Sequence, residues 1–330
     1  MILKNILKIS FYLIFLMTAH LANAESQLEW ALEPWPQWMT TLKQEAINQG
    51  ISSNTFNTAL NNMQGPDAKI LTLLKTQPEQ RLTYNQYLNT RASADRIAFG
   101  QKEYQQYQTV LQAIQQDYGV DPCIIVALWG METSYGHFMG NFSTPQALAT
   151  LAYASDRPAF FRNELLQALH MINDHQVTLK TFKGEWAGAS GQCQFLPSSW
   201  YQYAVDYDND GQKNIWSSVP DVLASVANYM KQNGWESGHP LLITVQLPDS
   251  FDPIYVQTRE IKTLQEWANL GVLKANGQPL PNNNTPAFLV HPDGGPIWLA
   301  LNNFQTVLNY NNSIYYVGAI NYMADQICHR

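Results

Sequence analysis

One uncharged segment constrains the fold of this chain more than any other feature. The run CIIVALWGM, residues 123–131, contains no charged side chain. It follows Asp121-Pro122, a pair typical of a helix start, with Asp as the N-cap and Pro in the first turn. A helix that is apolar on all sides has to be covered on all sides. The sequence therefore predicts a central buried helix, and 45% hydrophobic residues in a chain of 330 can cover it.

The patterns around this segment are mostly helical. Apolar spacing predicts two helices in 34–63 and single helices over about 92–118, 157–175, 221–232 and 313–328. After Pro240, the short β-type runs LLITVQL, PIYVQ, AFLVHP and IWLAL predict a small mixed region over about 241–302. The predicted fold class is mainly α (α+β).

The first 24 residues predict an export signal. Lys4 and Lys8 precede an apolar run over 9–19, which is too short for a membrane-spanning helix of about 20 residues. The small-residue pattern at 22–24, A-N-A, is typical of a signal-peptide cleavage site. An uncleaved membrane anchor is the alternative. We expect an exported, periplasmic protein that is soluble after cleavage.

Charge and cysteine content exclude several partners. The net charge is −7 and the chain has no cluster of Lys and Arg, so we expect no nucleic-acid partner. Cys123, Cys193 and Cys328 allow at most one disulfide in a monomer and form no C-x-x-C motif. A zinc site is therefore not expected, and small buried side chains are the simplest interpretation of these cysteines.

Glu132 is the first candidate for chemistry. It stands at the end of the apolar helix, in ALWGMETSYG. Burial of an unpaired carboxylate disfavours its charged form and raises its pKa, which a general acid near neutral pH requires. The alternative is a glutamate that turns outward at the helix end and is solvated.

The Gly-rich stretch GEWAGASGQCQFLPSSW, residues 184–200, is the second candidate. Its glycines allow a backbone to approach a ligand closely, and its aromatic side chains can stack on sugar faces. Ser190 lies in G-A-S-G-Q and not in G-x-S-x-G, so the nucleophile elbow of a serine hydrolase is not present. An ordinary Gly-rich turn is the alternative.

An acidic loop is the third candidate. The spacing D-x-D-x-D-G over 206–211 matches the start of an EF-hand calcium loop. Ser217 stands at the twelfth position in place of the usual bidentate Glu, and Asp221 is the predicted substitute. The predicted metal ligands are Asp206, Asp208, Asp210, Gln212 through its main-chain oxygen, and Asp221. We predict a structural calcium ion and no organic cofactor, with an acidic surface turn as the alternative.

These segments occur in an order that resembles a known family. ALWGMETSYG, GEWAGASGQCQFLPSSW, the acidic loop and LASVANYMKQNGW at 223–235 closely resemble the B-type lytic murein transglycosylases, glycoside hydrolase family 103. The resemblance covers about 30–330. It implies an N-terminal helical domain over 25–115 and a lysozyme-like catalytic domain over 116–240 that contains the calcium loop, 206–221. A β-containing region with a C-terminal helix would follow over 241–330.

The resemblance also implies an activity and a substrate site. Family members cleave the β-1,4 bond between N-acetylmuramic acid and N-acetylglucosamine in peptidoglycan and leave 1,6-anhydromuramoyl ends. Glu132 matches the catalytic glutamate, as acid and then as base. The positions that match substrate-binding residues are Gln194, Tyr229 and Asn311 for the sugar, and Arg157 for the peptide stem. The implied partners are peptidoglycan glycan strands and, further, cell-wall synthesis proteins; we expect a monomer.

Two residues depart from the family pattern. Glu185 stands before W-A-G, where family members commonly have a small residue, and Cys193 stands where they commonly have another residue. We expect Glu185 to face solvent. If it pointed into the cleft, it could hold water and favour a hydrolytic muramidase. A catalytically silent peptidoglycan-binding protein is the other alternative.

Overall fold

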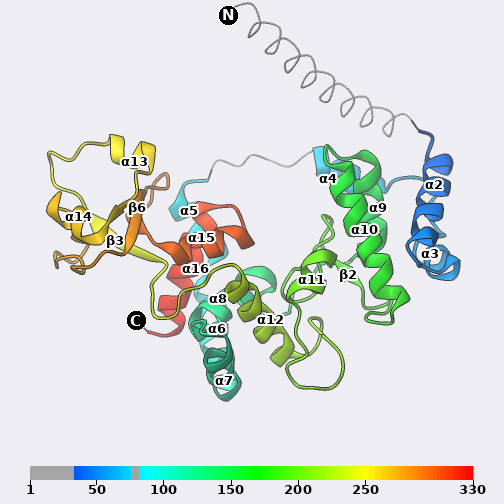
Figure 1. Ribbon diagram of the computed structural model, residues 1–330, viewed down its shortest axis with the longest axis horizontal. Coiled ribbons are helices and arrows are strands. Elements are labelled where there is room, and N and C mark those ends of the chain that lie inside the picture. Colours follow the sequence, from blue (N-terminus) through cyan, green and yellow to red (C-terminus); the bar gives the residue numbers. More distant parts are fainter. Residues whose placement is uncertain (1–32, 76–81, 330) are drawn as a thin grey trace, which may run out of the picture. The chain divides into compact units, whose positions relative to one another are not determined.

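The computed structural model describes residues 33–75 and 82–329 (Figure 1). Most of these residues lie in helices, and a small antiparallel sheet follows late in the chain, which confirms the predicted fold class. The predicted signal peptide, residues 1–24, lies outside the described ranges. Within those ranges, no helix has both the length and the apolar character that crossing a bilayer requires.

The chain divides into two compact units that interleave along the sequence. The described residues of unit 1 come from 33–75, 140–190 and 196–198, and those of unit 2 come from 82–139, 191–195 and 199–329. Both predicted domain boundaries, after residues 115 and 240, fall inside unit 2. The Gly-rich stretch 184–200 contributes residues to both units.

Unit 1 is a small helical body. It contains α2 (Trp35–Asn48), α3 (Ser53–Leu60), α4 (Ala68–Lys75), α9 (Thr144–Ala154) and α10 (Pro158–Asn173), with the paired strands β1 (Phe142–Ser143) and β2 (Lys183–Gly184). The two helices predicted in 34–63 are confirmed by α2 and α3. Ser52 caps α3 by accepting a hydrogen bond from Thr55 N at 3.0 Å. Buried Glu164 accepts hydrogen bonds from Ser198 N and Oγ, which attaches 196–198 to α10.

Unit 2 is built around the predicted apolar helix. Its other helices are α5 (Tyr84–Arg91), α6 (Ala94–Gln106), α7 (Gln108–Tyr118), α12 (Val219–Gln232), α13 (Ile254–Thr258), α14 (Leu264–Asn269), α15 (Asn302–Tyr310) and α16 (Ile314–Ile327). α11 (Pro197–Tyr203) begins in unit 1 and ends in unit 2. The apolar helix itself is α8 (Pro122–Thr133), and every one of its residues except Glu132 is buried. Asp121 caps it by accepting from Cys123 N at 2.9 Å, as predicted.

Two predictions of secondary structure are wrong. The single helix expected over about 92–118 is two helices, α6 and α7, separated at Tyr107. α6 packs on α8 and α16, whereas α7 packs on α8 and α12. Because the two halves of the segment pack on different helices, they form two helices and not one. PIYVQ is not a strand but helix α13, because Asp252 accepts a hydrogen bond from Ile254 N at 2.9 Å and starts a helical turn.

The late strands form one five-stranded antiparallel sheet in the order β4-β6-β7-β3-β5. The strands are β3 (Leu242–Gln246), β4 (Lys262–Thr263), β5 (Leu273–Lys274), β6 (Pro286–Val290) and β7 (Ile297–Ala300). Figure 1 shows α13 and α14 next to this sheet. Leu264 and Trp267 of α14 pack against Leu289 and Leu299 of the sheet and form a local hydrophobic core. The predicted strands in LLITVQL, AFLVHP and IWLAL are therefore confirmed.

Candidate active site

Glu132 occupies the end of α8, where α16 runs beside it. Tyr316, which is buried in the first turn of α16, donates a short hydrogen bond to Glu132 Oε1. At the other end of α8, Cys123 forms a disulfide with Cys328, directly after α16. The two helices are thus antiparallel neighbours, joined covalently at one end and by the Glu132–Tyr316 hydrogen bond at the other.

The surroundings of Glu132 make its carboxyl a weak acid. Burial raises its pKa from the ordinary 4.5 to about 7, while the Tyr316 hydrogen bond and the positive charge of Arg91 oppose this rise. The carboxyl is therefore in part protonated near neutral pH and can donate a proton. Glu132 is only partly exposed as a residue. This is the environment that the apolar helix predicted for a general acid.

The chain turns sharply directly after Glu132. Ser134 and Tyr135 have φ values of 49° and 61°, in the left-handed region that residues with a Cβ rarely adopt. Tyr135 is buried and donates from Oη to Arg96 O at 2.9 Å. Its ring lies so close to Gly100 and Gly130 that a Cβ at either position would collide with it. These two glycines therefore allow the tyrosine to hold the turn against α6.

Gln192 joins α8 to the segment 191–195. Its Oε1 accepts from Trp129 Nε1 at 2.8 Å, and its main-chain oxygen accepts from Thr133 Oγ1 at 3.1 Å. Its Nε2 donates to Trp216 O at 3.0 Å, and its main-chain N donates to Ile215 O at 2.8 Å. Gln192 is buried, so these hydrogen bonds fix the end of α8, the Gly-rich segment and the acidic loop to one another.

Gln194 lies in the same segment in a strained backbone conformation. Its φ is 51°, and its Nε2 donates to Gly191 O at 2.9 Å and to Met139 O at 3.3 Å. The preceding Cys193 is buried, and Tyr310 Oη donates to Cys193 O at 2.5 Å. Burial, with Glu132 as the next cause, raises the pKa of the Cys193 thiol. Cys193, next to Gln194 in the sequence, is thus near enough to Glu132 to be affected by its charge.

Tyr229 belongs to an aromatic cluster in unit 2. Its ring centroid lies 4.7 Å from that of Tyr310, 4.5 Å from Tyr203 and 5.9 Å from Phe195. Its Oη donates to Asn309 O at 2.8 Å, and burial raises its pKa to about 12. Tyr310, which contacts Tyr229, also donates a hydrogen bond to Cys193 O. Tyr310 therefore connects Tyr229 to Cys193, whose pKa the Glu132 charge affects.

The remaining predicted substrate residues are exposed. Asn311 is the C-cap of α15 and follows Tyr310 directly. Arg157 belongs to unit 1, where it precedes α10 and its guanidinium lies 4.0 Å from the Phe160 ring centroid. Glu185, the residue that departs from the family pattern, also belongs to unit 1 and is exposed. Glu132, Gln194, Tyr229 and Asn311 all belong to unit 2, whereas Arg157 belongs to unit 1.

The acidic loop gathers three carboxylates. One oxygen from each of Asp206, Asp208 and Asp210 lies within 4.8 Å of the other two. Asp206 accepts from Asp210 N and Gly211 N, and Asp210 accepts from Gln212 N, so main-chain amides orient the side chains. Three carboxylates at this spacing repel one another, and a hard divalent cation with oxygen ligands matches them.

Asp221 takes a different place from the other predicted ligands. It is fully buried in the first turn of α12 and accepts from Tyr207 N and Asn214 N at 2.8 Å, and from Asp208 N at 3.4 Å. It is not one of the three clustered carboxylates. Because main-chain amides of the loop donate to its carboxylate, Asp221 attaches the loop to α12. Gln212 is exposed and follows the three clustered aspartates in the sequence.

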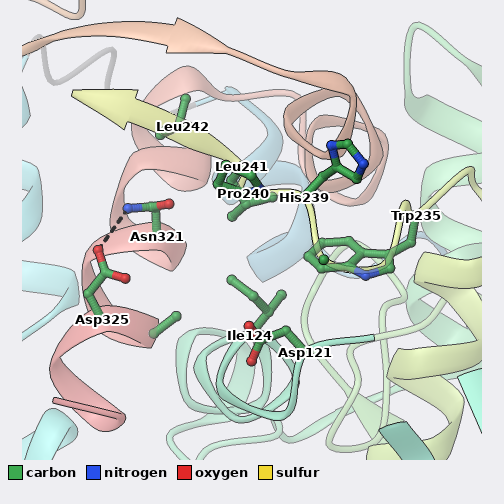
Figure 2. Close-up of a pocket in the computed structure, with 11 residues that line it drawn as sticks. Asp121, Ile124, Trp235, His239, Pro240, Leu241, Leu242, Asn321 and Asp325 are labelled. Carbon is green, nitrogen blue, oxygen red and sulfur yellow. Dashed lines mark hydrogen bonds between the residues drawn. The ribbon is translucent and has the colours of Figure 1, made fainter. Parts of the chain in front are cut away.

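A separate cavity of about 290 Å³ lies in unit 2 (Figure 2). Figure 2 shows Asn321 and Asp325 from α16 on one side of the cavity and Trp235 on the other. Asp121 and Ile124, from the start of α8, lie below them in this view. Asn321 Nδ2 donates to Asp325 Oδ2 at 3.1 Å. None of the predicted site residues lines this cavity, so it is distinct from the surroundings of Glu132.

Sequence reasoning missed three residues of the site. Tyr316 bonds Glu132, Gln192 joins three segments, and Arg91 lowers the Glu132 pKa. Gln192 lies inside the Gly-rich stretch 184–200, which was a candidate segment, but nothing in the stretch marks Gln192 itself. Tyr316 and Arg91 have no local pattern that marks them, because their roles depend on helices far apart in sequence.

Comparison with known proteins places the chain in a family. It matches the family described as transglycosylase SLT domain over residues 34–325. It is 37% identical over 235 residues to membrane-bound lytic murein transglycosylase B of Escherichia coli (strain K12), which covers 68% of this chain and 62% of the relative. The match therefore spans less than two thirds of the length of that relative.

Solved structures agree in fold. SltB3 from Pseudomonas aeruginosa in complex with NAG-anhNAM-pentapeptide has a TM-score of 0.86 and 39% identity, over 90% of this chain and 80% of that chain. Escherichia coli lytic transglycosylase SLT35 in complex with calcium has a TM-score of 0.77 and 30% identity, over 88% of this chain and 92% of that chain. The family match covers nearly all of the described residues, and the chain belongs to the transglycosylase SLT domain family.

Proposed function

We propose that this protein is a peptidoglycan lytic transglycosylase that leaves 1,6-anhydromuramoyl ends. The observation that carries the proposal is the environment of Glu132. Ordinary glycosidases use two carboxyl groups that flank the scissile bond. The Glu132 carboxyl is bonded by the Tyr316 hydroxyl, and burial raises its pKa to about 7. A single acid that is in part protonated suits a reaction whose nucleophile belongs to the substrate.

The reaction needs Glu132 in two steps. The protonated carboxyl donates its proton to the glycosidic oxygen, and the bond to the anomeric carbon breaks while the 2-acetamido carbonyl of the substrate stabilises the positive charge. The Glu132 carboxylate then accepts the proton of the 6-hydroxyl, whose oxygen attacks the anomeric carbon and forms the anhydro ring. Attack within one sugar gains from proximity, and no water enters the product. Tyr316 holds the carboxyl in place during both steps.

Substrate binding is assigned to the residues around Glu132. Gln194, with its fixed backbone, and Tyr229, with its aromatic neighbours, would orient the sugar, together with Asn311 at the end of α15. Arg157, exposed on unit 1, would pair with an acid of the peptide stem. The SltB3 complexes with NAG-anhNAM-pentapeptide and NAG-NAM-pentapeptide support peptidoglycan glycan strands as the substrate class.

Calcium is assigned to the acidic loop. Asp206, Asp208 and Asp210 would hold the ion with the main-chain oxygen of Gln212, and Asp221 would orient the loop from α12. The bound ion would neutralise the three carboxylates and supply no proton to the reaction. The calcium complex of SLT35 supports this assignment. Export to the periplasm, a monomeric state and contacts with cell-wall synthesis proteins complete the proposal.

Analysis of the ends of digested peptidoglycan by mass tests the proposal. Purified glycan strands incubated with the protein should yield fragments with anhydro ends, which are lighter by one water than reducing ends. Reducing ends would instead show a hydrolytic muramidase. Binding without any products would show a protein that only holds glycan strands. The exposure of Glu185 gives no support to the hydrolytic alternative.

A further inference from the structure

A second pocket of unit 2 lies beside the turn that follows Glu132. Its volume is about 220 Å³, which is smaller than the roughly 300–1,000 Å³ typical of drug-sized ligands. The lining residues come from the first half of α6 and from the turn after α8. They are Ser93, Asp95, Arg96, Phe99, Ser134, Tyr135, His137 and Phe138, and we call this site the Phe138 pocket. A pocket of this size suits one sugar ring.

The rim of the Phe138 pocket carries two exposed aromatic rings. The Phe138 side chain is 73% exposed and that of Phe99 is 47% exposed. The Phe99 ring lies 5.6 Å from the His137 ring, centroid to centroid. Exposed apolar groups surrounded by polar side chains are typical of a ligand-binding surface. The faces of these rings can contact the C–H groups of a pyranose ring, while the exposed Ser93 and Asp95 side chains of the lining can bond its hydroxyls.

The backbone around the pocket is already fixed. Arg96 donates from Nε and Nη2 to Ser134 Oγ at 3.2 and 2.9 Å. Phe138 N donates to Thr133 O at 2.9 Å, and His137 Nδ1 lies 2.7 Å from Ser134 O. Phe138 therefore stands on a turn that hydrogen bonds hold at both ends, and Phe99 stands on α6. A preformed site loses less conformational entropy when it binds a ligand.

The pocket lies near Glu132 along the chain. Ser134, in its lining, follows Glu132 by two residues on the chain. Arg96, also in the lining, donates from Nη1 to Arg91 O. Arg91 is near enough to both Glu132 and Arg96 to change their pKa values. The pocket lining and Glu132 thus belong to one unit, where the turn after α8 and Arg91 connect them.

We propose that the Phe138 pocket is an additional carbohydrate subsite, which binds one pyranose ring of a glycan strand away from the bond cleaved at Glu132. This inference rests on the proposed function, because it needs a substrate that extends beyond that bond. The neutral ring faces and hydroxyls of the strand are what the two phenylalanines and the polar lining recognise. An apolar side chain of a protein partner is the other occupant that the test below distinguishes.

The test measures the affinity for N-acetylglucosamine oligomers of increasing length by calorimetry. The Glu132→Gln protein serves as the parent, so that the oligomers are not consumed. In the parent, affinity should increase with length once an oligomer reaches the pocket. Phe138→Ala should lower the affinity for long oligomers by about three- to tenfold, as expected for loss of one aromatic contact, and leave that for the disaccharide unchanged. Phe138→Trp should keep the affinity for long oligomers.

Ile261→Ala is the matched control. Ile261 is 68% exposed in unit 2 and does not line the pocket, so its removal should leave the affinity for every oligomer unchanged. The melting temperature of each variant establishes that it is folded. Equal affinities of the parent and Phe138→Ala for long oligomers would overturn the subsite, as would a parent whose affinity does not depend on length. Either result would be expected if the pocket binds an apolar side chain of a protein partner and no sugar.

The result also separates the subsite from the proposed function. If the unmodified protein produces anhydro ends but Phe138→Ala binds long oligomers as the parent does, the subsite is wrong and the function stands. If no anhydro ends form but oligomer binding depends on length and on Phe138, the transglycosylase function is wrong. The pocket then remains a carbohydrate site of a protein with another activity.

Discussion

Opposing effects within unit 2 set the pKa of Glu132. Burial at the end of α8 raises the pKa of the carboxyl to about 7, while the Tyr316 hydrogen bond and the charge of Arg91 limit the rise. A carboxyl with a pKa near 7 can both give and take a proton at neutral pH, which the two steps proposed for Glu132 require. The apolar sequence around Glu132 predicted the burial. Tyr316 could not be predicted, because it lies 184 residues away and meets Glu132 only through the fold.

Replacement of Tyr316 by Phe should shift the pH dependence of turnover. The Tyr316 hydrogen bond stabilises the carboxylate and so lowers the Glu132 pKa; without it, that pKa should rise. Because the protonated acid starts the reaction, the loss of activity above neutral pH should move to higher pH in Tyr316→Phe. Release of soluble fragments from peptidoglycan, measured between pH 5 and 9, reports this shift.

Tyr322→Phe is the control for that series. Tyr322 lies on the same helix, α16, is 37% exposed and does not bond Glu132, so its pH profile should match that of the unmodified protein. A Tyr316→Phe profile that keeps the original alkaline limb, or moves it to lower pH, would mean that this hydrogen bond does not set the acidity of Glu132.

At the scale of elements, α8 and α16 form the pair that supports the site. Each helix was predicted from its own pattern, α8 from its uncharged run and α16 from the last apolar segment. Their pairing was not predicted, since Cys123 and Cys328 are 205 residues apart and three cysteines left three pairings open. The break at Tyr107 was not predicted for the same reason. The apolar spacing over 92–118 is that of one helix, but α6 and α7 pack on different helices that lie far away in the sequence.

Loss of the Cys123–Cys328 disulfide should destabilise unit 2. The disulfide joins the start of α8 to the end of α16 and constrains the unfolded chain over a long loop. The double variant Cys123→Ser, Cys328→Ser should lose about 2–4 kcal/mol of unfolding free energy. Thermal or denaturant unfolding measures this loss. A reductant should lower the melting temperature of the unmodified protein and leave that of the double variant unchanged; no effect on either would contradict the role given to this disulfide.

At the scale of the molecule, the acidic loop connects to the site through two buried side chains. Asp221 attaches the loop to α12, which carries Tyr229, and Gln192 attaches the loop at Ile215 and Trp216 to α8, which carries Glu132. The order of the motifs along the sequence predicted the family. The interleaving of units 1 and 2 was not predicted, because local patterns do not show that 140–190 and 33–75 share one compact body.

Calcium should therefore stabilise the fold without taking part in proton transfer. An ion that binds only the folded state adds RT ln(1 + [L]/Kd), about 2.7 kcal/mol at a hundredfold excess over Kd. Chelation should lower the melting temperature, calcium should restore it, and Asp208→Ala should abolish this response. We expect affinity in the millimolar or sub-millimolar range, since Ser217 replaces the usual twelfth ligand.

Asp249→Ala is the matched control for the loop. Asp249 is exposed in unit 2 outside the acidic loop, so this variant should keep the full response to calcium. A melting temperature that is indifferent to both calcium and chelator would show that the loop is only an acidic turn. A change of turnover with calcium, at a temperature where the calcium-free protein is fully folded, would contradict a purely structural ion.

The most direct test of the account compares two glutamates as catalytic acids. Glu132→Gln keeps the side-chain volume but cannot donate the proton, and general acid–base catalysis contributes typically about 10²–10⁴-fold. Anhydro-ended fragments, quantified by mass after digestion of peptidoglycan, should fall by at least that factor in Glu132→Gln. They should be unchanged in Glu185→Gln, which alters an exposed residue. Production of anhydro ends by Glu132→Gln within a few-fold of the unmodified protein, or its loss in Glu185→Gln alone, would contradict the account.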